Sequence, residues 1–130
     1  MKKLMTAVAL IAFTSGSAMA QDAPKFFQDT YPDYALGQAM GLVGALEGDK
    51  AAIDAKTMQL IQLGVAAQIP CEYCIYYHTK AAKVAGASDA EIKAAIAAAA
   101  DTRMWSTVLN GNAYDFEAFK AEVDQLIPTN

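Results

Sequence analysis

A run of alanines between residues 94 and 100, interrupted only by Ile96, most constrains what this chain can fold into. Alanine is the best helix former, and its small side chain favours close contact between helices. The motif Ser88-Asp89-Ala90-Glu91, which precedes the run, has the pattern of a helix capping box. A long helix is therefore predicted from about Asp89 to the break at Asn110-Gly111-Asn112.

The rest of the chain is also helical in pattern, and no stretch shows the alternation typical of a strand. Further helices are expected at residues 34–46, from Asp54 as N-cap to about Gln68, from about Cys71 to Ala85 with Gly86 as C-cap, and before Pro128, while residues 21–30 form an extended arm or a short first helix. The prediction is an all-α fold, a compact single-domain bundle of five or six helices.

Two expectations concern burial. The helix that ends near Gln68 is apolar nearly all round, except for a stripe of Gln59, Gln62 and Ala66 at helical spacing. Buried amides need hydrogen-bond partners, so this stripe predicts polar contacts inside the bundle. Trp105 is expected in the core.

The first twenty residues have the layout of a secretory signal peptide. Lys2 and Lys3 precede an apolar stretch that is too short to span a membrane, and small residues end in Ala18-Met19-Ala20. We therefore expect a mature chain of residues 21–130, exported to the periplasm or secreted, with no membrane segment after cleavage.

Charge limits the partners of the mature chain. Cleavage removes two of ten basic residues and none of fourteen acidic ones, which leaves a formal charge of −6. Such a surface argues against nucleic-acid binding. A chain of this length makes one domain with a modest core, and oligomerisation would bury more of it.

The two cysteines and the single histidine lie close together in Cys71-Glu72-Tyr73-Cys74-Ile75-Tyr76-Tyr77-His78. At about 100° per residue, Cys71, Cys74 and His78 project within an arc of roughly 60° on one helix face. Both cysteines fall in the first turn, where the positive end of the helix dipole stabilises a thiolate. In an exported protein we expect them to form a disulfide.

This spacing points to redox chemistry. His78 lies four residues after Cys74 and can take up its thiol proton, which makes Cys74 the candidate nucleophile and Cys71 the thiol that resolves a sulfenic acid. A purely stabilising disulfide is the plainer alternative. A loop of four residues contributes only about 2 kcal/mol in the chain-entropy account, against about 3 kcal/mol for fifteen residues.

Haem and zinc fit these residues less well. The c-type haem pattern needs a histidine directly after the second cysteine, and here it follows four residues later. A zinc ion would find two thiolates and one imidazole, with no further cysteine or histidine for a fourth ligand. We therefore expect no resident metal and no cofactor.

Three segments together resemble the carboxymuconolactone decarboxylase superfamily, in its alkylhydroperoxidase D-like branch. They are Lys56-Thr57-Met58-Gln59-Leu60-Ile61, then Cys71-Glu72-Tyr73-Cys74 with His78, then Gly86-Ala87-Ser88-Asp89-Ala90-Glu91-Ile92. The resemblance extends over about residues 35–110. It implies an all-α fold that assembles as a homotrimer or homohexamer.

The resemblance also implies roles for the site residues. Cys74 would be peroxidatic, Cys71 resolving, and His78 part of a proton relay. Gln59 occupies the position where that relay commonly has a glutamate, and an amide can orient a proton carrier but cannot carry a proton as a carboxylate does. Gln62, one turn further, is able to share the orienting role.

Three functions compete at this point. The first is a thiol-dependent, peroxidase-like antioxidant protein that reduces a hydroperoxide through a Cys71/Cys74 dithiol-disulfide cycle, with an unidentified thiol reductant. The second is a thiol-disulfide oxidoreductase that acts on proteins. The third is a non-catalytic oligomeric scaffold in which the disulfide has no chemical role.

Overall fold

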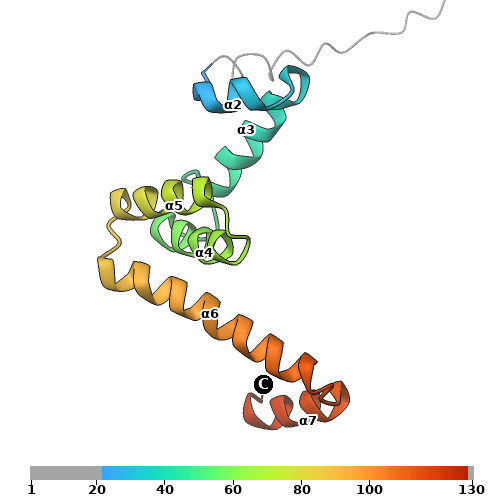
Figure 1. The fold of residues 1–130 in the computed structure, drawn as a ribbon. Helices are drawn as coiled ribbons and strands as arrows, with labels where there is room; N and C mark the ends of the chain where they lie inside the picture. The colour runs from blue at the N-terminus through green and yellow to red at the C-terminus, as the bar shows by residue number, and fades with distance from the viewer. Residues whose placement is uncertain (1–21, 129–130) are drawn as a thin grey trace, which may run out of the picture. The chain divides into compact units, whose positions relative to one another are not determined.

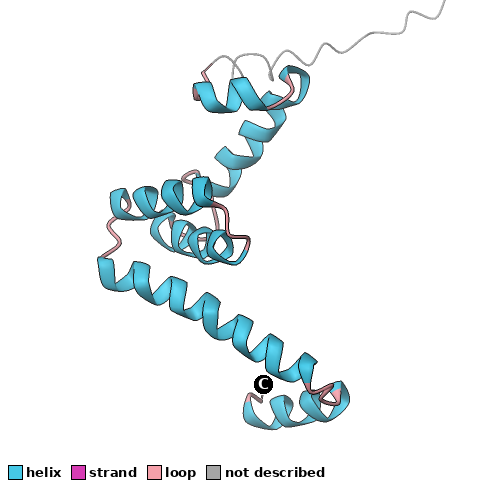
Figure 2. Cartoon of the chain, in the orientation of Figure 1, coloured by secondary structure: helices cyan, strands magenta, loops and turns pink. Residues whose placement is uncertain are grey.

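The structure is a computed structural model that describes residues 22–128, and every regular element within them is a helix (Figures 1 and 2). The helices are α2 (Lys25–Thr30), α3 (Asp33–Glu47), α4 (Ala55–Gln68), α5 (Glu72–Val84), α6 (Asp89–Gly111) and α7 (Phe116–Leu126). The predicted all-α fold of five or six helices is confirmed. The expected signal peptide, residues 1–20, lies outside the described residues.

The described helices divide into two units at residue 52. The first unit contains α2 and α3, where Ala23 and Leu36 are buried. The side-chain amide of Gln28, within α2, donates to the backbone oxygen of Ala23 at 2.6 Å, which ties the segment before α2 to the helix. The segment expected to be an arm or a short helix is therefore the helix α2.

The second unit, from Ile53 onward, contains α4 to α7 and is organised around α4, which packs against both α5 and α6. Its core consists of Leu63, Ala82, Ala87 and Ile92, with Leu63 fully buried. Three of these four side chains come from α4, α5 and α6, so the core is the place where the three helices meet.

The helix starts follow the polar residues that the sequence places there. The Asp54 side chain accepts from the Thr57 N–H at 3.0 Å and begins α4. Ser88 and Glu91 form the predicted capping box at the start of α6. Because each cap satisfies a backbone N–H that has no partner within the helix, these short polar segments determine where the helices begin.

Helix α5 ends at a glycine for a geometric reason. Gly86 has φ +89°, a left-handed conformation that other L residues rarely adopt. The Gly86 N–H donates to the Lys83 oxygen at 3.0 Å and the Ala87 N–H to the Ala82 oxygen at 2.9 Å, which is a Schellman arrangement. The chain thereby turns directly from α5 into α6.

One ion pair connects α4 to α6. Lys56 Nζ lies 2.7 Å from Glu91 Oε1. The hydrogen bond from Lys56, together with those from Ser88, lowers the pKa of Glu91 to about 2. Glu91 therefore caps the start of α6 and also forms the ion pair that connects α6 to α4.

Two expectations about burial are wrong for the single chain. The α4 helix is not covered all round, since Ile61 is 47% exposed and Val65 53% exposed. Trp105 is 53% exposed and does not belong to the core. The side of α4 that is covered carries the amide stripe, where Gln59 and Ala66 are buried.

None of the helices between residues 22 and 128 combines the length and the hydropathy that crossing a membrane requires.

Candidate redox site

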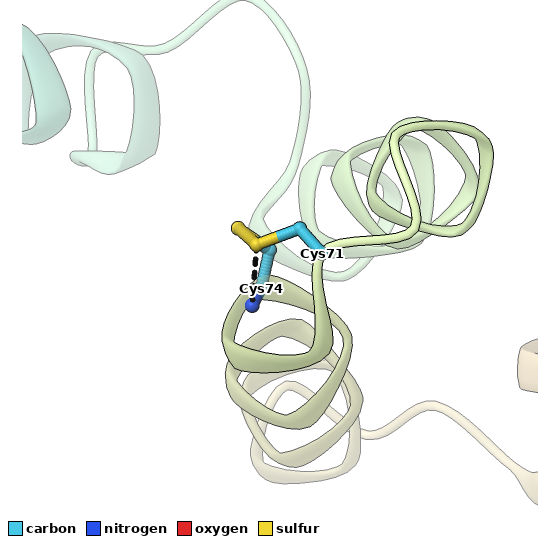
Figure 3. Close-up of a disulfide and its surroundings, with 2 residues drawn as sticks. All are labelled: Cys71 and Cys74. Carbon is cyan, nitrogen blue, oxygen red and sulfur yellow. Dashed lines mark hydrogen bonds between the residues drawn. A yellow bond between two sulfur atoms is a disulfide. The ribbon is translucent and has the colours of Figure 1, made fainter.

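Cys71 and Cys74 form a disulfide at the start of α5, with their Cα atoms 5.3 Å apart (Figure 3). Cys71 is the N-cap residue of the helix and Cys74 lies in its first turn. The predicted pairing of the two cysteines is confirmed. The pair is therefore in its oxidised form, in which neither sulfur can act as a thiolate.

The backbone around Cys71 explains why the pair lies at this position. The Cys71 N–H donates to the Ala66 oxygen at 3.1 Å, which ties the start of α5 to the end of α4. The Cys74 N–H donates to Cys71 Sγ at 3.2 Å, the dashed line in Figure 3. Cys71 sulfur thus occupies the place where a capping oxygen usually accepts a hydrogen bond at a helix N-terminus.

This position has an electrostatic consequence for the reduced form. A backbone N–H aimed at a sulfur, together with the positive end of the helix dipole, stabilises a thiolate there. The hydrogen bond goes to Cys71, whereas the spacing from His78 predicts that Cys74 is the nucleophile. The capping role of Cys71 was missed, although its place at the first residue after Pro70 was a signal for a helix start.

His78 is held by Gln59. The ring atom Nδ1 of His78 lies 2.8 Å from Gln59 Oε1, and Gln59 is only 5% exposed. Because an amide oxygen only accepts hydrogen bonds, the neutral imidazole in this arrangement carries its proton on Nδ1. Nε2 is then the basic ring atom, and the buried Gln59 amide has the hydrogen-bond partner that a buried amide needs.

The four predicted site residues lie on the facing sides of α4 and α5. Cys74, His78 and Ala82 follow one another along the less exposed side of α5, while Tyr73 and Tyr76 on the other side are mostly exposed. The structure brings Cys71 to Cys74, and Gln59 to His78. Since Cys74 and His78 are one helical turn apart, the two pairs are neighbours along the same interface.

Gln62 is a second amide on α4. It follows Gln59 by one turn of α4 and is partly buried. Its Oε1 atom is buried and accepts no hydrogen bond from the described residues. A buried acceptor without a donor is costly, so this atom marks a position where a donor from outside the chain would be stabilising.

A resident metal ion would need several ligand side chains that converge on one point. Between residues 22 and 128, no three side chains of histidine, cysteine, aspartate or glutamate converge in a way that would hold a metal ion. The functional groups at the site are those of Cys71, Cys74, His78 and Gln59, with Gln62 one turn further along α4.

Comparison with known proteins identifies the family. The sequence profile described as the carboxymuconolactone decarboxylase family matches residues 35–114, more than half of the 130-residue chain. The matched range includes α4, α5 and α6 and thus both pairs of the site. No curated protein and no solved structure was found to match the chain. The all-helical fold and this match agree, and the chain belongs to the carboxymuconolactone decarboxylase family.

Proposed function

We propose that this protein is a thiol-dependent peroxidase that reduces hydroperoxides through a Cys71/Cys74 dithiol-disulfide cycle. One observation carries the proposal: the disulfide lies one helical turn from a histidine that a buried amide holds in a defined orientation. A disulfide that served only as a staple would need neither the histidine nor the buried amide.

The cycle begins from the reduced pair. The Cys74 thiolate attacks one oxygen of the hydroperoxide, the O–O bond breaks, and an alcohol leaves after taking up a proton. Cys74 becomes a sulfenic acid. The Cys71 thiol then displaces its hydroxyl, which forms the disulfide and releases water. A dithiol reductant of another molecule supplies the two electrons that restore both thiols.

His78 moves the protons in this scheme. Its Nε2 accepts the Cys74 thiol proton and returns a proton to the leaving alkoxide, while Gln59 keeps the other ring nitrogen protonated. Gln59 is therefore a positioning residue. The unpartnered Gln62 Oε1 is the acceptor we assign to the hydroxyl of a bound hydroperoxide or of a water in the relay.

The resemblance of the CxxCxxxH segment to the alkylhydroperoxidase D-like branch supports this function, and the layout of residues 1–20 supports export to the periplasm or secretion. Export separates the protein from cytosolic thiol reductants. The reductant is then a dithiol that is present in the same compartment.

The experiment follows oxidation of the reduced protein after rapid mixing with a small organic hydroperoxide. Thiol titration and mass spectrometry are compared for the wild type and for Cys74→Ser, Cys71→Ser and His78→Ala. We expect Cys74→Ser to abolish fast oxidation, His78→Ala to slow it by about 10²–10⁴-fold, the range for general acid-base groups, and Cys71→Ser to accumulate a sulfenic acid on Cys74.

The matched control is Gln68→Ala, which removes an amide from the α6-facing side of α4 and should leave the rate unchanged. Oxidation of the wild type no faster than that of a free thiol would overturn the peroxidase proposal.

A second candidate, a thiol-disulfide oxidoreductase acting on proteins, is favoured by the hydrogen bond from the Cys74 N–H to Cys71 Sγ. This bond makes Cys71 the thiol with the more stable thiolate and hence the better leaving group in exchange. The candidate requires a reduction potential of about −120 to −270 mV, the range of exchange enzymes. Loss of exchange in Cys71→Ser, with no peroxide reaction in the wild type, would support it. If the wild type shows neither activity, the non-catalytic scaffold remains.

A further inference from the structure

Gln62 Oε1 is a buried acceptor on α4 that has no donor among the described residues. The other two amides of the same helix are satisfied. Gln59 Oε1 lies 2.8 Å from His78 Nδ1, and Gln68 Oε1 accepts from Arg103 Nε at 2.7 Å. Burying the Gln62 oxygen costs free energy, and this cost is offset only in a state that supplies a donor.

Two hydrogen bonds set the register of α4 against α5. Gln59 on α4 contacts His78 on α5. The Ala66 oxygen accepts from the Cys71 N–H at 3.1 Å. Because the two contacts are seven positions apart on each segment, the helices run antiparallel and in register between them. Gln62 therefore lies level with the turn of α5 that separates the disulfide from the histidine.

Gln62 and Cys74 also lie on the same flank of the α4/α5 contact. Leu60 and Ile75 pack against the core that contains Ile92 of α6, so they mark the flank that faces α6. At about 100° per residue, Gln62 lies about 200° from Leu60 round α4. Cys74 is turned about 100° from Ile75 round α5, likewise away from α6. Register and flank together place the Gln62 amide beside the Cys74 side chain.

The disulfide has no proton to donate, but the intermediate that precedes it does. When the Cys74 thiolate attacks the terminal oxygen of a hydroperoxide, that oxygen passes to sulfur together with its hydrogen, and the alkoxide leaves. We propose that Gln62 Oε1 accepts a hydrogen bond from the hydroxyl of the Cys74 sulfenic acid. The contact lasts until Cys71 attacks the sulfur, when the hydroxyl leaves with the Cys71 thiol proton as water.

This role rests on the proposed peroxidase function and extends it from the substrate to the intermediate. The O–H group that Gln62 contacts in a bound hydroperoxide is the same group that it then contacts on sulfur. Gln62 thus keeps one hydrogen bond while the O–O bond breaks and the S–O bond forms.

The contact opposes irreversible oxidation of Cys74. A sulfenic acid reacts with a second hydroperoxide to give a sulfinic acid and an alcohol, and the deprotonated sulfenate is the stronger nucleophile in this step. A hydroxyl that donates to a neutral amide oxygen retains its proton, because the hydrogen bond stabilises the protonated form. Gln62 should therefore slow the over-oxidation of Cys74 and allow Cys71 to form the disulfide first.

The test uses the reduced protein in a Cys71→Ser background, in which the sulfenic acid persists. Gln62→Met keeps the length of the side chain but removes the strong acceptor, whereas Gln62→Glu keeps an oxygen at the same place. Gln68→Met is the matched control on the same helix. With tert-butyl hydroperoxide as oxidant, mass spectrometry follows the conversion of thiol to sulfenic acid, trapped with dimedone, and of sulfenic to sulfinic acid. The ratio of the second rate to the first cancels changes in hydroperoxide binding, because both steps consume the same hydroperoxide.

We expect Gln62→Met to raise this ratio about two- to tenfold, the factor that one neutral hydrogen bond contributes. Gln62→Glu should keep the ratio at or below that of the parent, because its acceptor remains and its charge opposes the sulfenate. Gln68→Met should leave it unchanged. An unchanged ratio in Gln62→Met would overturn the proposal. An equal rise in Gln62→Glu or in Gln68→Met would also overturn it, because the substitutions would then act only by opening the site.

This inference and the peroxidase function fail separately. Any thiol reaches a sulfenic acid when enough hydroperoxide is present, so the ratio can be measured even if Cys74 reacts no faster than a free thiol. Such slow oxidation would overturn the peroxidase function. The ratio would still decide whether Gln62 contacts the hydroxyl on Cys74.

Discussion

Replacement of Gln59 by glutamate puts a carboxylate at the position of an amide oxygen that lies 2.8 Å from His78 Nδ1. An opposite charge within about 4–6 Å raises the pKa of an imidazole by about 1–3. At 1.36 kcal/mol per pH unit, this corresponds to about 1.4–4 kcal/mol in favour of the imidazolium. Because Gln59 is only 5% exposed, water screens the new pair weakly, and we expect the upper half of that range.

The assay is direct, because the chain has a single histidine. Its ring Cε1–H resonance can be followed by NMR as a function of pH without any assignment. The matched control is Gln68→Glu, the same substitution on the same helix. Gln68 accepts a hydrogen bond from Arg103 Nε at 2.7 Å on the α6-facing side, so a glutamate there should pair with Arg103 and leave the pKa of His78 unchanged.

An unchanged pKa of His78 in Gln59→Glu would refute the contact on which the proton relay depends. An equal rise in both variants would refute its specificity. If the pKa rises only in Gln59→Glu, the imidazolium should also lower the pKa of the reduced Cys74 thiol, and the rate of reaction with hydroperoxide at pH 7 should increase. Thiol titration at several pH values measures that second effect.

Three further predictions concern stability, each measured by denaturant or thermal unfolding. Glu91→Gln should destabilise the fold above pH 4.5 and flatten its pH dependence between 4.5 and about 2, because a carboxyl with a lowered pKa contributes stability that is lost as pH falls through this window. Equal pH dependence in both proteins would contradict this. Gly86→Ala should cost about 1–2 kcal/mol, because φ is +89° there, whereas Gly111→Ala, which meets no neighbour, should not destabilise. Leu63→Ala should cost about 2–5 kcal/mol, because the side chain is fully buried, and a smaller loss would show that the core collapses around the cavity.

Most of the fold was predictable because its helix ends are local. Asp54 and Ser88 begin helices, and Gly86 follows the end of one, through contacts within three to five residues that can be read from the sequence. The division of the described helices into two units was not predictable in the same way. The division depends on which helices pack together, and the apolar pattern of α3 does not indicate which helix it packs against.

Spacing along the sequence predicts the parts of the site that lie within one helix. It does not predict contacts between residues of two different helices. The disulfide and the shared side of Cys74 and His78 follow from positions in α5. The contact of His78 with Gln59 joins residues 19 positions apart, so it required the packing of α4 on α5. The amide stripe indicated that a polar partner was needed, but only the family resemblance, which puts Gln59 in the relay with His78, pointed to the residue that supplies it.

The exposed state of Trp105 and Val65 shows what an apolar pattern measures. The periodicity of apolar residues predicts which face of a helix is buried. It does not predict which other segment buries that face. An alanine row on α6 and an apolar face on α7 are both patterns of contact between helices, yet in one chain they do not meet. The expectation for Trp105 and Val65 therefore went further than the pattern allows, because an apolar face along a helix is compatible with a neighbour that the described packing of α4, α5 and α6 does not supply.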